Sequence, residues 1–334
     1  MDKDNDLIKF LREGAKNGDF SSLKTTIPYQ VRLDFFNRGQ LINKDGNNVY
    51  NMFGYYGMFE HLFTDEEAIK LIKETADYQK RFILILCLPD EEKLRYLPEI
   101  IQNKKLKDII DVIAVIKNEE LKNKAIEQVF QEEIVLSPYH VAKLIEMATG
   151  EFKSILFDMV LERQKETNEE MISAVYISEI LNNFSDDKKL DILDKIISFS
   201  KQQTQSFNSL ISNSNDDDVL KCFKNNGDRL EALKKMYAYL KEKYVYINIS
   251  ELLKCFPQNM WKELIKILID KFPNEISYFV GIGSLRYDNP EYLIDIGFEL
   301  ETDKNRLISS STLMLIIEPL PIERKKIWIN RSII

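Results

Sequence analysis

Apolar residues recur every three to four positions along most of the chain, which is the spacing of one face of an α-helix. Two such stripes are Ala68, Leu71, Ile72 and Thr75, and Ile155, Leu156, Met159 and Val160. Alternating strand patterns are rare. The best candidate is residues 244–250 (YVYINIS), and the LLKCF that follows it indicates a helix start instead. The pattern therefore predicts an all-α protein.

Polar residues mark where several predicted helices begin. Residues 64–67 (TDEE) have the form of a capping box, in which Thr64 accepts from the third backbone N–H and Glu67 reaches back. Residues 185–187 (SDD) and 215–217 (NDD) place a cap and acidic side chains where the helix dipole favours them. These signals divide the apolar stripes into separate helices.

The predicted helices form similar pairs around polar corners. Residues 82–101 (FILILCLPDEEKLRYLPEII) have the pattern helix, corner, helix, and the same plan returns at 111–130, 143–162, 178–197, 250–269 and 313–334. The early corners recur at roughly 29 to 36 residues, the period of two-helix solenoid repeats. Because one pair cannot bury its apolar face alone, neighbouring pairs must stack. This predicts a right-handed α-solenoid, a superhelix of antiparallel helix pairs; an irregular helical domain is the alternative.

The N-terminal part carries a different motif. Residues 45–57 (DGNNVYNMFGYYG) resemble an ankyrin repeat, with Asp45, Gly46 and Gly57 at the matching positions of its turn and first helix. Residues 11–24 resemble the end of an inner helix and the outer helix after it. The later pairs lack the Asp-Gly turn and resemble HEAT repeats. The resemblance implies degenerate ankyrin-like units in residues 1–63 and a HEAT-like array in residues 64–334, closed by a capping helix.

Composition narrows the class of protein. The 334 residues are 44% hydrophobic, enough for a continuous core, and the net charge of −8 argues against a nucleic-acid partner. Cys87, Cys222 and Cys255 each lie in an apolar run without a CxxC motif, so we expect buried, reduced thiols. The N-terminus lacks a signal-peptide core, and no apolar run is long enough to span a bilayer. We expect a cytoplasmic protein, or one delivered into a host cell without a cleaved signal.

No motif specifies a reaction. His61 and His140 fit no zinc pattern, and Asp216–Asp218 is best explained as a helix start, with a divalent-metal site as the alternative. Residues 281–290 (GIGSLRYDNP) lack the third glycine of a dinucleotide-binding loop and predict a turn, with Pro290 beginning the next helix. We therefore predict no catalytic residue, no metal and no cofactor.

Crowded aromatic residues are the strongest candidates for binding a partner. Tyr50, Phe53, Tyr55, Tyr56 and Phe59 cover more than one helix face, so one or two should be exposed. Sealing the end of the solenoid is the alternative role for them. Trp328, among basic residues near the C-terminus, is a second candidate, and there the alternative is a capping helix.

These features favour a non-catalytic scaffold that binds another protein on the concave surface of its repeats. The Lys/Ile/Asn-rich composition and the degenerate repeats resemble pathogen effectors that bind host proteins. One alternative is an enzyme with a divergent helical active site that uses Asp216–Asp218 or His61. Another is a HEAT-type nucleic-acid binder resembling the alkylpurine glycosylases. It would need a catalytic Asp and a basic stripe such as Lys104, Lys105, Lys107, Lys122 and Lys124.

Overall fold

The computed structural model divides the chain into two compact units, residues 1–159 and residues 160–334. It describes residues 22–38, 40–42, 48–51, 61–132, 134–167, 169–202, 216–242, 249–270, 290–300 and 322–333, with a few isolated positions between them. The predicted division into residues 1–63 and 64–334 stays a prediction.

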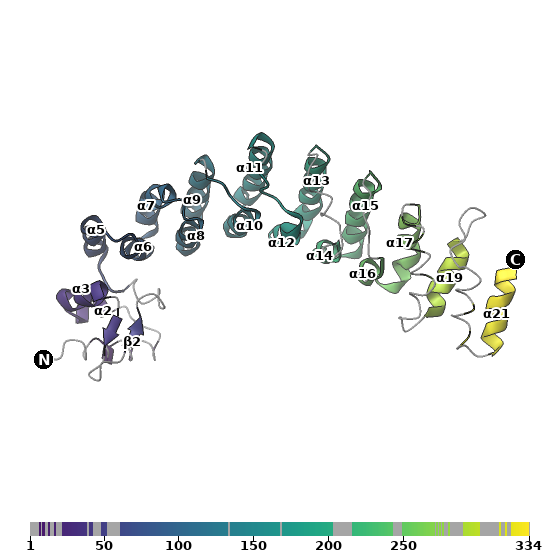
Figure 1. The fold of residues 1–334 in the computed structure, drawn as a ribbon, viewed down its shortest axis with the longest axis horizontal. Helices are drawn as coiled ribbons and strands as arrows, with labels where there is room; N and C mark the ends of the chain where they lie inside the picture. The colour runs from purple at the N-terminus through teal and green to yellow at the C-terminus, as the bar shows by residue number, and fades with distance from the viewer. Residues whose placement is uncertain are drawn as a thin grey trace. The chain divides into compact units, whose positions relative to one another are not determined.

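Unit 1 is built from short helices joined by short connections. Its helices are α2 (Leu23–Thr26), α3 (Tyr29–Arg38), α5 (Asp65–Glu74), α6 (Tyr78–Leu86), α7 (Asp90–Gln102), α8 (Leu106–Val115), α9 (Glu119–Gln131) and α10 (Pro138–Met147), and α11 (Phe152–Thr167) begins here and continues into unit 2. From α5 to α9 each helix contacts the next one, and α6 contacts α8, α8 contacts α10 and α7 contacts α9. The helices therefore form two rows, which we name row A (α6, α8, α10) and row B (α7, α9) (Figure 1).

Unit 2 repeats this plan. Its described elements are η2 (Ala174–Tyr176), α12 (Ile177–Asn182), α13 (Asp186–Gln202), α14 (Asp216–Lys221), α15 (Asn226–Glu242), α16 (Ile249–Lys254), η4 (Gln258–Met260), α17 (Trp261–Leu268), α19 (Pro290–Leu300) and α21 (Ile322–Ile333). Its row A is α12, α14 and α16, and its row B is α13, α15 and α17, with contacts along each row. The predicted all-α class and solenoid-like stacking are confirmed, while the handedness stays a prediction.

One short antiparallel pair interrupts the helical pattern. Strand β1 (Gln40–Ile42) pairs with β2 (Asn48–Asn51), with Leu41 opposite Tyr50. The ankyrin resemblance had placed the start of a helix at residues 48–51, so this part of the prediction is wrong. β-Branched and aromatic residues such as Val49 and Tyr50 favour extended backbone, which explains the difference.

Helix starts follow the sequence closely. Thr64 and Glu67 form the predicted capping box, in which the Glu67 N–H donates to the Thr64 hydroxyl at 3.3 Å and the Thr64 N–H donates to the Glu67 carboxylate at 2.9 Å. Helices α13, α14 and α19 begin at Asp186, Asp216 and Pro290, as expected. Residues 244–248 of the strand candidate at 244–250 lie outside the described residues, and its last two residues begin α16, in agreement with the helix start indicated there.

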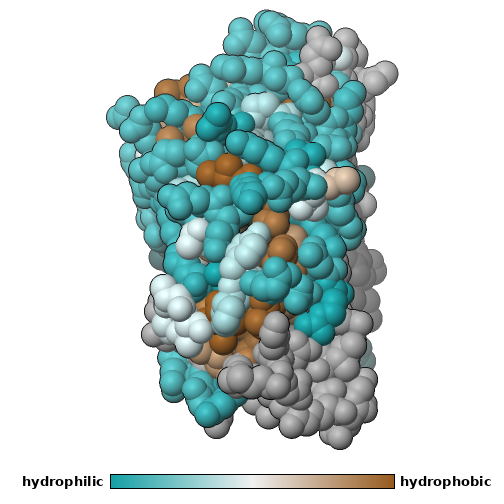
Figure 2. All heavy atoms as spheres, turned by 90° about the vertical axis from the view of Figure 1, so that its left-hand side faces the viewer, coloured by the Kyte–Doolittle hydropathy of each residue, from teal (hydrophilic) through white to brown (hydrophobic). Residues whose placement is uncertain are grey.

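Burial confirms most of the predicted core. Ala68, Leu71 and Ile72 are buried on α5. On α11, Leu156 and Val160 are buried but Ile155 is 54% exposed, which corrects its predicted place on that face. The buried stripe of α11 includes Phe157 and Gln164, and position 155 falls outside it. Figure 2 shows that the described residues on the face it draws are mainly hydrophilic, with small hydrophobic patches between them.

No disulfide joins the three cysteines. Cys222 and Cys255 are buried, as predicted, whereas Cys87 is half-buried. Cys87 follows the last residue of α6, where the chain turns toward α7, so its side chain is not enclosed on all sides. None of the helices in the described part has the length and apolar character that crossing a bilayer requires.

Candidate interaction site

A similar set of hydrogen bonds, made by a buried lysine, recurs at the connections from row A to row B. Lys93, at the start of α7, is buried and its ammonium donates to Asp90 at 3.2 Å and to the Val115 carbonyl at 3.3 Å. Lys189, at the start of α13, donates to Asp186 at 2.7 Å and to the Cys222 carbonyl at 2.8 Å. In both cases the accepting carbonyl belongs to the next helix pair, and the residue after it, Ile116 or Phe223, is buried.

Two arginines make an equivalent contact. Arg229 on α15 donates to the Cys255 carbonyl, which precedes the buried Phe256. Arg32 on α3 donates to the Leu62 carbonyl at 2.6 Å, which precedes the buried Phe63. A long cationic side chain thus satisfies a corner carbonyl of the following pair at four places, which reduces the cost of burying that carbonyl.

Asp90 completes the corner between α8 and α9. One of its carboxylate oxygens accepts from the backbone N–H groups of Lys117 and Asn118, each at 2.8 Å. Burial alone would raise the pKa of Asp90, but these bonds and the one from Lys93 hold the pKa below its usual value. At these described corners of the A-to-B side, the buried polar groups are therefore used in bonds within each unit.

The opposite side of unit 1 is built differently. The connections at 87–89, 103–105 and 116–118 are short, so consecutive helices run antiparallel and row A helices all begin on one side. We name this side of unit 1 the B-to-A edge. It carries Tyr78 at the start of α6, Lys105 just before α8 and Tyr139 in the first turn of α10.

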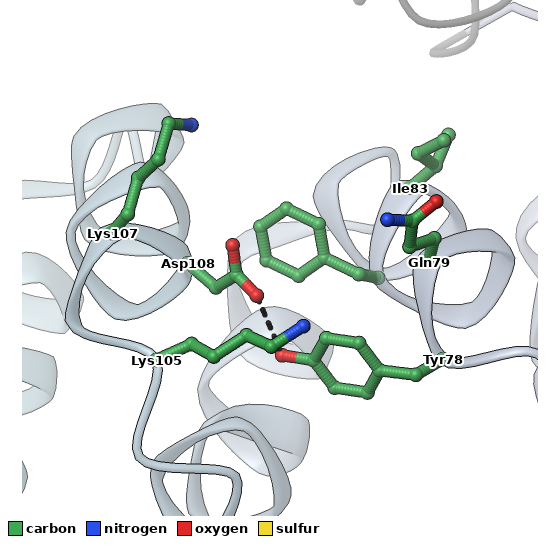
Figure 3. Close-up of a pocket in the computed structure, with 7 residues that line it drawn as sticks. Tyr78, Gln79, Ile83, Lys105, Lys107 and Asp108 are labelled. Atoms are coloured by element: carbon green, nitrogen blue, oxygen red, sulfur yellow. Dashed lines mark hydrogen bonds between the residues drawn. The ribbon is translucent and has the colours of Figure 1, made fainter.

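A hollow of about 130 Å³ lies between α6 and α8 at this edge (Figure 3). Its lining residues are Tyr78, Gln79, Phe82 and Ile83 from α6 and Lys105, Lys107 and Asp108 from the start of α8. The Tyr78 hydroxyl donates to Asp108 at 2.9 Å, and the Lys105 ammonium lies 4.7 Å from the centre of the Tyr78 ring. Burial and the Asp108 carboxylate raise the pKa of Tyr78, so it stays a neutral phenol.

Lys105 and Lys107 line the hollow, and Lys104 precedes them in the chain. Lys107 pairs with Asp111 at 2.6 Å. Lys104 and Lys105 are exposed, and neither forms an ion pair within the described part of the chain. Lys104 also has a φ of 53°, the left-handed region that favours glycine. Lys105 therefore brings to the hollow an ammonium group with which no carboxylate of the described residues pairs.

Exposed apolar side chains lie near the start of α10. Val135 is 68% exposed and Tyr139 is 47% exposed. The Tyr139 ring packs edge-on against His140, with ring centres 5.4 Å apart. His140 is held by Ser137, whose hydroxyl oxygen is 2.5 Å from the Nδ1 atom, and burial lowers the pKa of His140. The B-to-A edge thus combines apolar, aromatic and cationic groups.

The aromatic residues that the sequence predicted to bind a partner remain untested. Tyr50 lies on β2 and Trp328 on α21, but their side chains lie outside the described residues. Phe53, Tyr55, Tyr56 and Phe59 also lie outside them. Their role in partner binding stays a prediction.

The other candidate residues do not assemble into a reactive centre in the described part. His61 lies in a turn and His140 lies on α10. Asp216–Asp218 open α14, consistent with the interpretation as a helix start. Residues 281–289 lie outside the described range. No group of three potential metal ligands occurs among the described residues.

The hollow was not found from the sequence because its two halves are distant in the chain. Tyr78 and Asp108 are 30 positions apart, and neither belongs to a recognisable motif. The only available signal was their equivalent place in the first turn of two successive row A helices.

Comparison of the chain with protein-family models, curated proteins and solved structures found no significant match. The ankyrin-like, HEAT-like and effector resemblances therefore stay predictions, and the argument for function depends on the site itself.

Proposed function

We propose that the chain is a non-catalytic helical-repeat module that binds a protein partner, and that unit 1 contacts this partner through its B-to-A edge. The observation that carries the proposal is the difference between the two sides of unit 1. The A-to-B side uses polar groups internally at Lys93 and Asp90, whereas the B-to-A edge exposes Tyr139, Val135 and Lys105, which pairs with no carboxylate of the described residues. Exposed aromatic and aliphatic groups beside charges are typical of binding surfaces.

The finer features of the proposal come from the sequence. Contact through a concave repeat surface and a second contact at the predicted aromatic cluster (Tyr50, Phe53, Tyr55, Tyr56 and Phe59) or at Trp328 remain part of it. A host-cell protein is the kind of partner that the Lys/Ile/Asn-rich composition and degenerate repeats favour. The location proposed for the chain is the cytoplasm or a host cell.

Nucleic acid is less well supported as a partner. Of the basic stripe considered for it, Lys107 pairs with Asp111 and Lys124 pairs with Glu120 at 2.7 Å. Cations already neutralised by neighbouring carboxylates contribute little to phosphate binding.

Site-specific photo-crosslinking tests the proposal. A photoreactive amino acid would replace Tyr139 in the full chain, and in a control would replace the exposed Lys117 on the A-to-B side. The protein would be irradiated in eukaryotic cell lysate and its adducts identified by mass spectrometry. One protein should be crosslinked repeatedly to position 139, and the same protein should not be crosslinked to position 117. A parallel sample carrying Tyr55→Ala and Tyr56→Ala tests the aromatic cluster. Absence of an adduct at 139, or the same adducts from both positions, would contradict the proposed edge.

A further inference from the structure

The hollow between α6 and α8 has a definite chemical character. Phe82 and Ile83 form an apolar floor, and Tyr78 and Phe82 stack with their ring centres 6.2 Å apart. In Figure 3 the Asp108 carboxylate lies between the two helices and is bonded to the Tyr78 hydroxyl. Its position is therefore fixed within the wall, leaving the two lysines as the lining cations.

Lys105 is the cation best placed to meet a ligand. Its ammonium lies over the Tyr78 ring at 4.7 Å, and no carboxylate of the described residues pairs with it. A cation over an aromatic face keeps donors available for a hydrogen-bond acceptor. Lys107 adds a second ammonium, shared with Asp111. The positive charge that Lys105 brings is a local feature, because the whole chain has a net charge of −8.

The backbone is strained at Lys104, the residue directly before Lys105. Lys104 follows the end of α7 with a φ of 53°, and its N–H donates to the Ile101 carbonyl at 2.9 Å. Glycine or asparagine is usual at such a helix end, and a long side chain there is strained. Among the described residues it is the one non-glycine position with positive φ. Such strain is found most often where a side chain has a function to perform.

We propose that the hollow binds a carboxylate-bearing peptide segment of the protein partner, with Lys105 donating to the carboxylate and the floor of Phe82 and Ile83 contacting an adjacent apolar side chain. The inference rests on the proposed function and adds the chemical class of the partner segment. Charge complementarity selects this occupant, because Lys105 lines the hollow and no carboxylate of the described residues pairs with it.

Peptide selection provides a direct test. Phage-displayed random peptides would be selected on the purified full chain, and individual peptides measured by fluorescence anisotropy. We expect the selected peptides to be enriched in Asp or Glu beside an apolar residue. Lys105→Glu should weaken their binding by at least about tenfold, because a hydrogen bond to a charged group is replaced by repulsion. The matched control Lys117→Glu, at an exposed lysine before α9, should leave binding unchanged.

A second variant separates function from folding. Lys104→Gly should raise the melting temperature, because it relieves the left-handed strain, and yet weaken peptide binding. A structural role alone predicts the higher melting temperature without a loss of binding. Selection of neutral or basic peptides, failure to select any, or equal binding by Lys105→Glu would each overturn the inference. So would binding of a single-stranded oligonucleotide that the selected peptides do not displace.

The two proposals fail in distinguishable ways. If position 139 crosslinks to one protein but the selected acidic peptides do not reduce that crosslinking, the B-to-A edge does bind a partner. The proposal that the partner segment in the hollow is acidic is then wrong. If acidic peptides bind at Lys105 and no protein crosslinks at position 139, the hollow is a peptide site and the wider edge is wrong.

Discussion

At the scale of single residues, Lys93 shows how the array is held together. Its ammonium is buried between two helix pairs and depends on Asp90 and the Val115 carbonyl for hydrogen bonds. We expect Lys93→Ala to lower the free energy of unfolding by about 2 kcal/mol or more, because it leaves both acceptors with an unmet bond. Urea denaturation followed by circular dichroism measures this change. Lys117→Ala, at an exposed position, should stay within about 0.5 kcal/mol of the parent.

His140 makes stability depend on pH in a definite direction. Burial lowers its pKa, so the folded chain favours the neutral ring. The stability that the neutral His140 ring contributes is fully present above the ordinary histidine pKa of about 6.5. It is lost as the pH falls from there through the lower pKa that His140 has in the folded chain. Melting temperatures of the parent and His140→Gln at about pH 7.5 and about pH 5.5 test this. The drop between them should be smaller in the variant, and an equal drop would contradict the assignment.

At the scale of elements, the entry into α5 combines a cap with an ion pair. Thr64 caps the helix, while Glu67 also accepts from the buried Arg32 at 2.8 and 3.2 Å. Burial would raise the pKa of Glu67, but the bonds from Arg32 and Thr64 hold it below its usual value. We expect Thr64→Ala to cost about 1 kcal/mol of stability and Thr64→Ser to cost much less, since serine keeps the capping oxygen. Thermal denaturation of the parent and the two variants measures this. Equal losses of stability in Thr64→Ala and Thr64→Ser would show that the capping oxygen is unimportant.

The helix pairs could be predicted because their information is local. Apolar spacing and first-turn acids identify α5, α7, α9 and α13 without knowledge of their neighbours. The strand at Asn48–Asn51 was missed because its motif resembles a turn followed by a helix, and pairing with Gln40–Ile42 decides otherwise. The hollow could not be predicted, since it exists only after the stacking of α6 on α8 brings Tyr78 to Asp108.

At the scale of the whole molecule, the stacking of each helix pair on its neighbours predicts which helices lose stability when one contact is removed. In a repeat array each helix pair is stabilised chiefly by the pairs next to it, so a local defect opens nearby segments first. Lys189 joins the start of α13 to the Cys222 carbonyl after α14, as Lys93 joins α7 to α8. The two positions therefore offer matched defects, one in each unit.

Native-state hydrogen exchange measured by mass spectrometry can locate the effect of each defect. Lys189→Ala should lower the protection of amide groups in α13, α14 and α15 and leave that of α6 to α8 close to the parent. Lys93→Ala should lower protection in α6 to α8 and leave that of α13, α14 and α15 close to the parent. The corner N–H groups of Lys117 and Asn118, which donate to Asp90, should lose protection only in the second variant. Uniform loss across both units from either substitution would mean that the chain opens as one cooperative body, against the nearest-neighbour stacking that the contacts between its helices support.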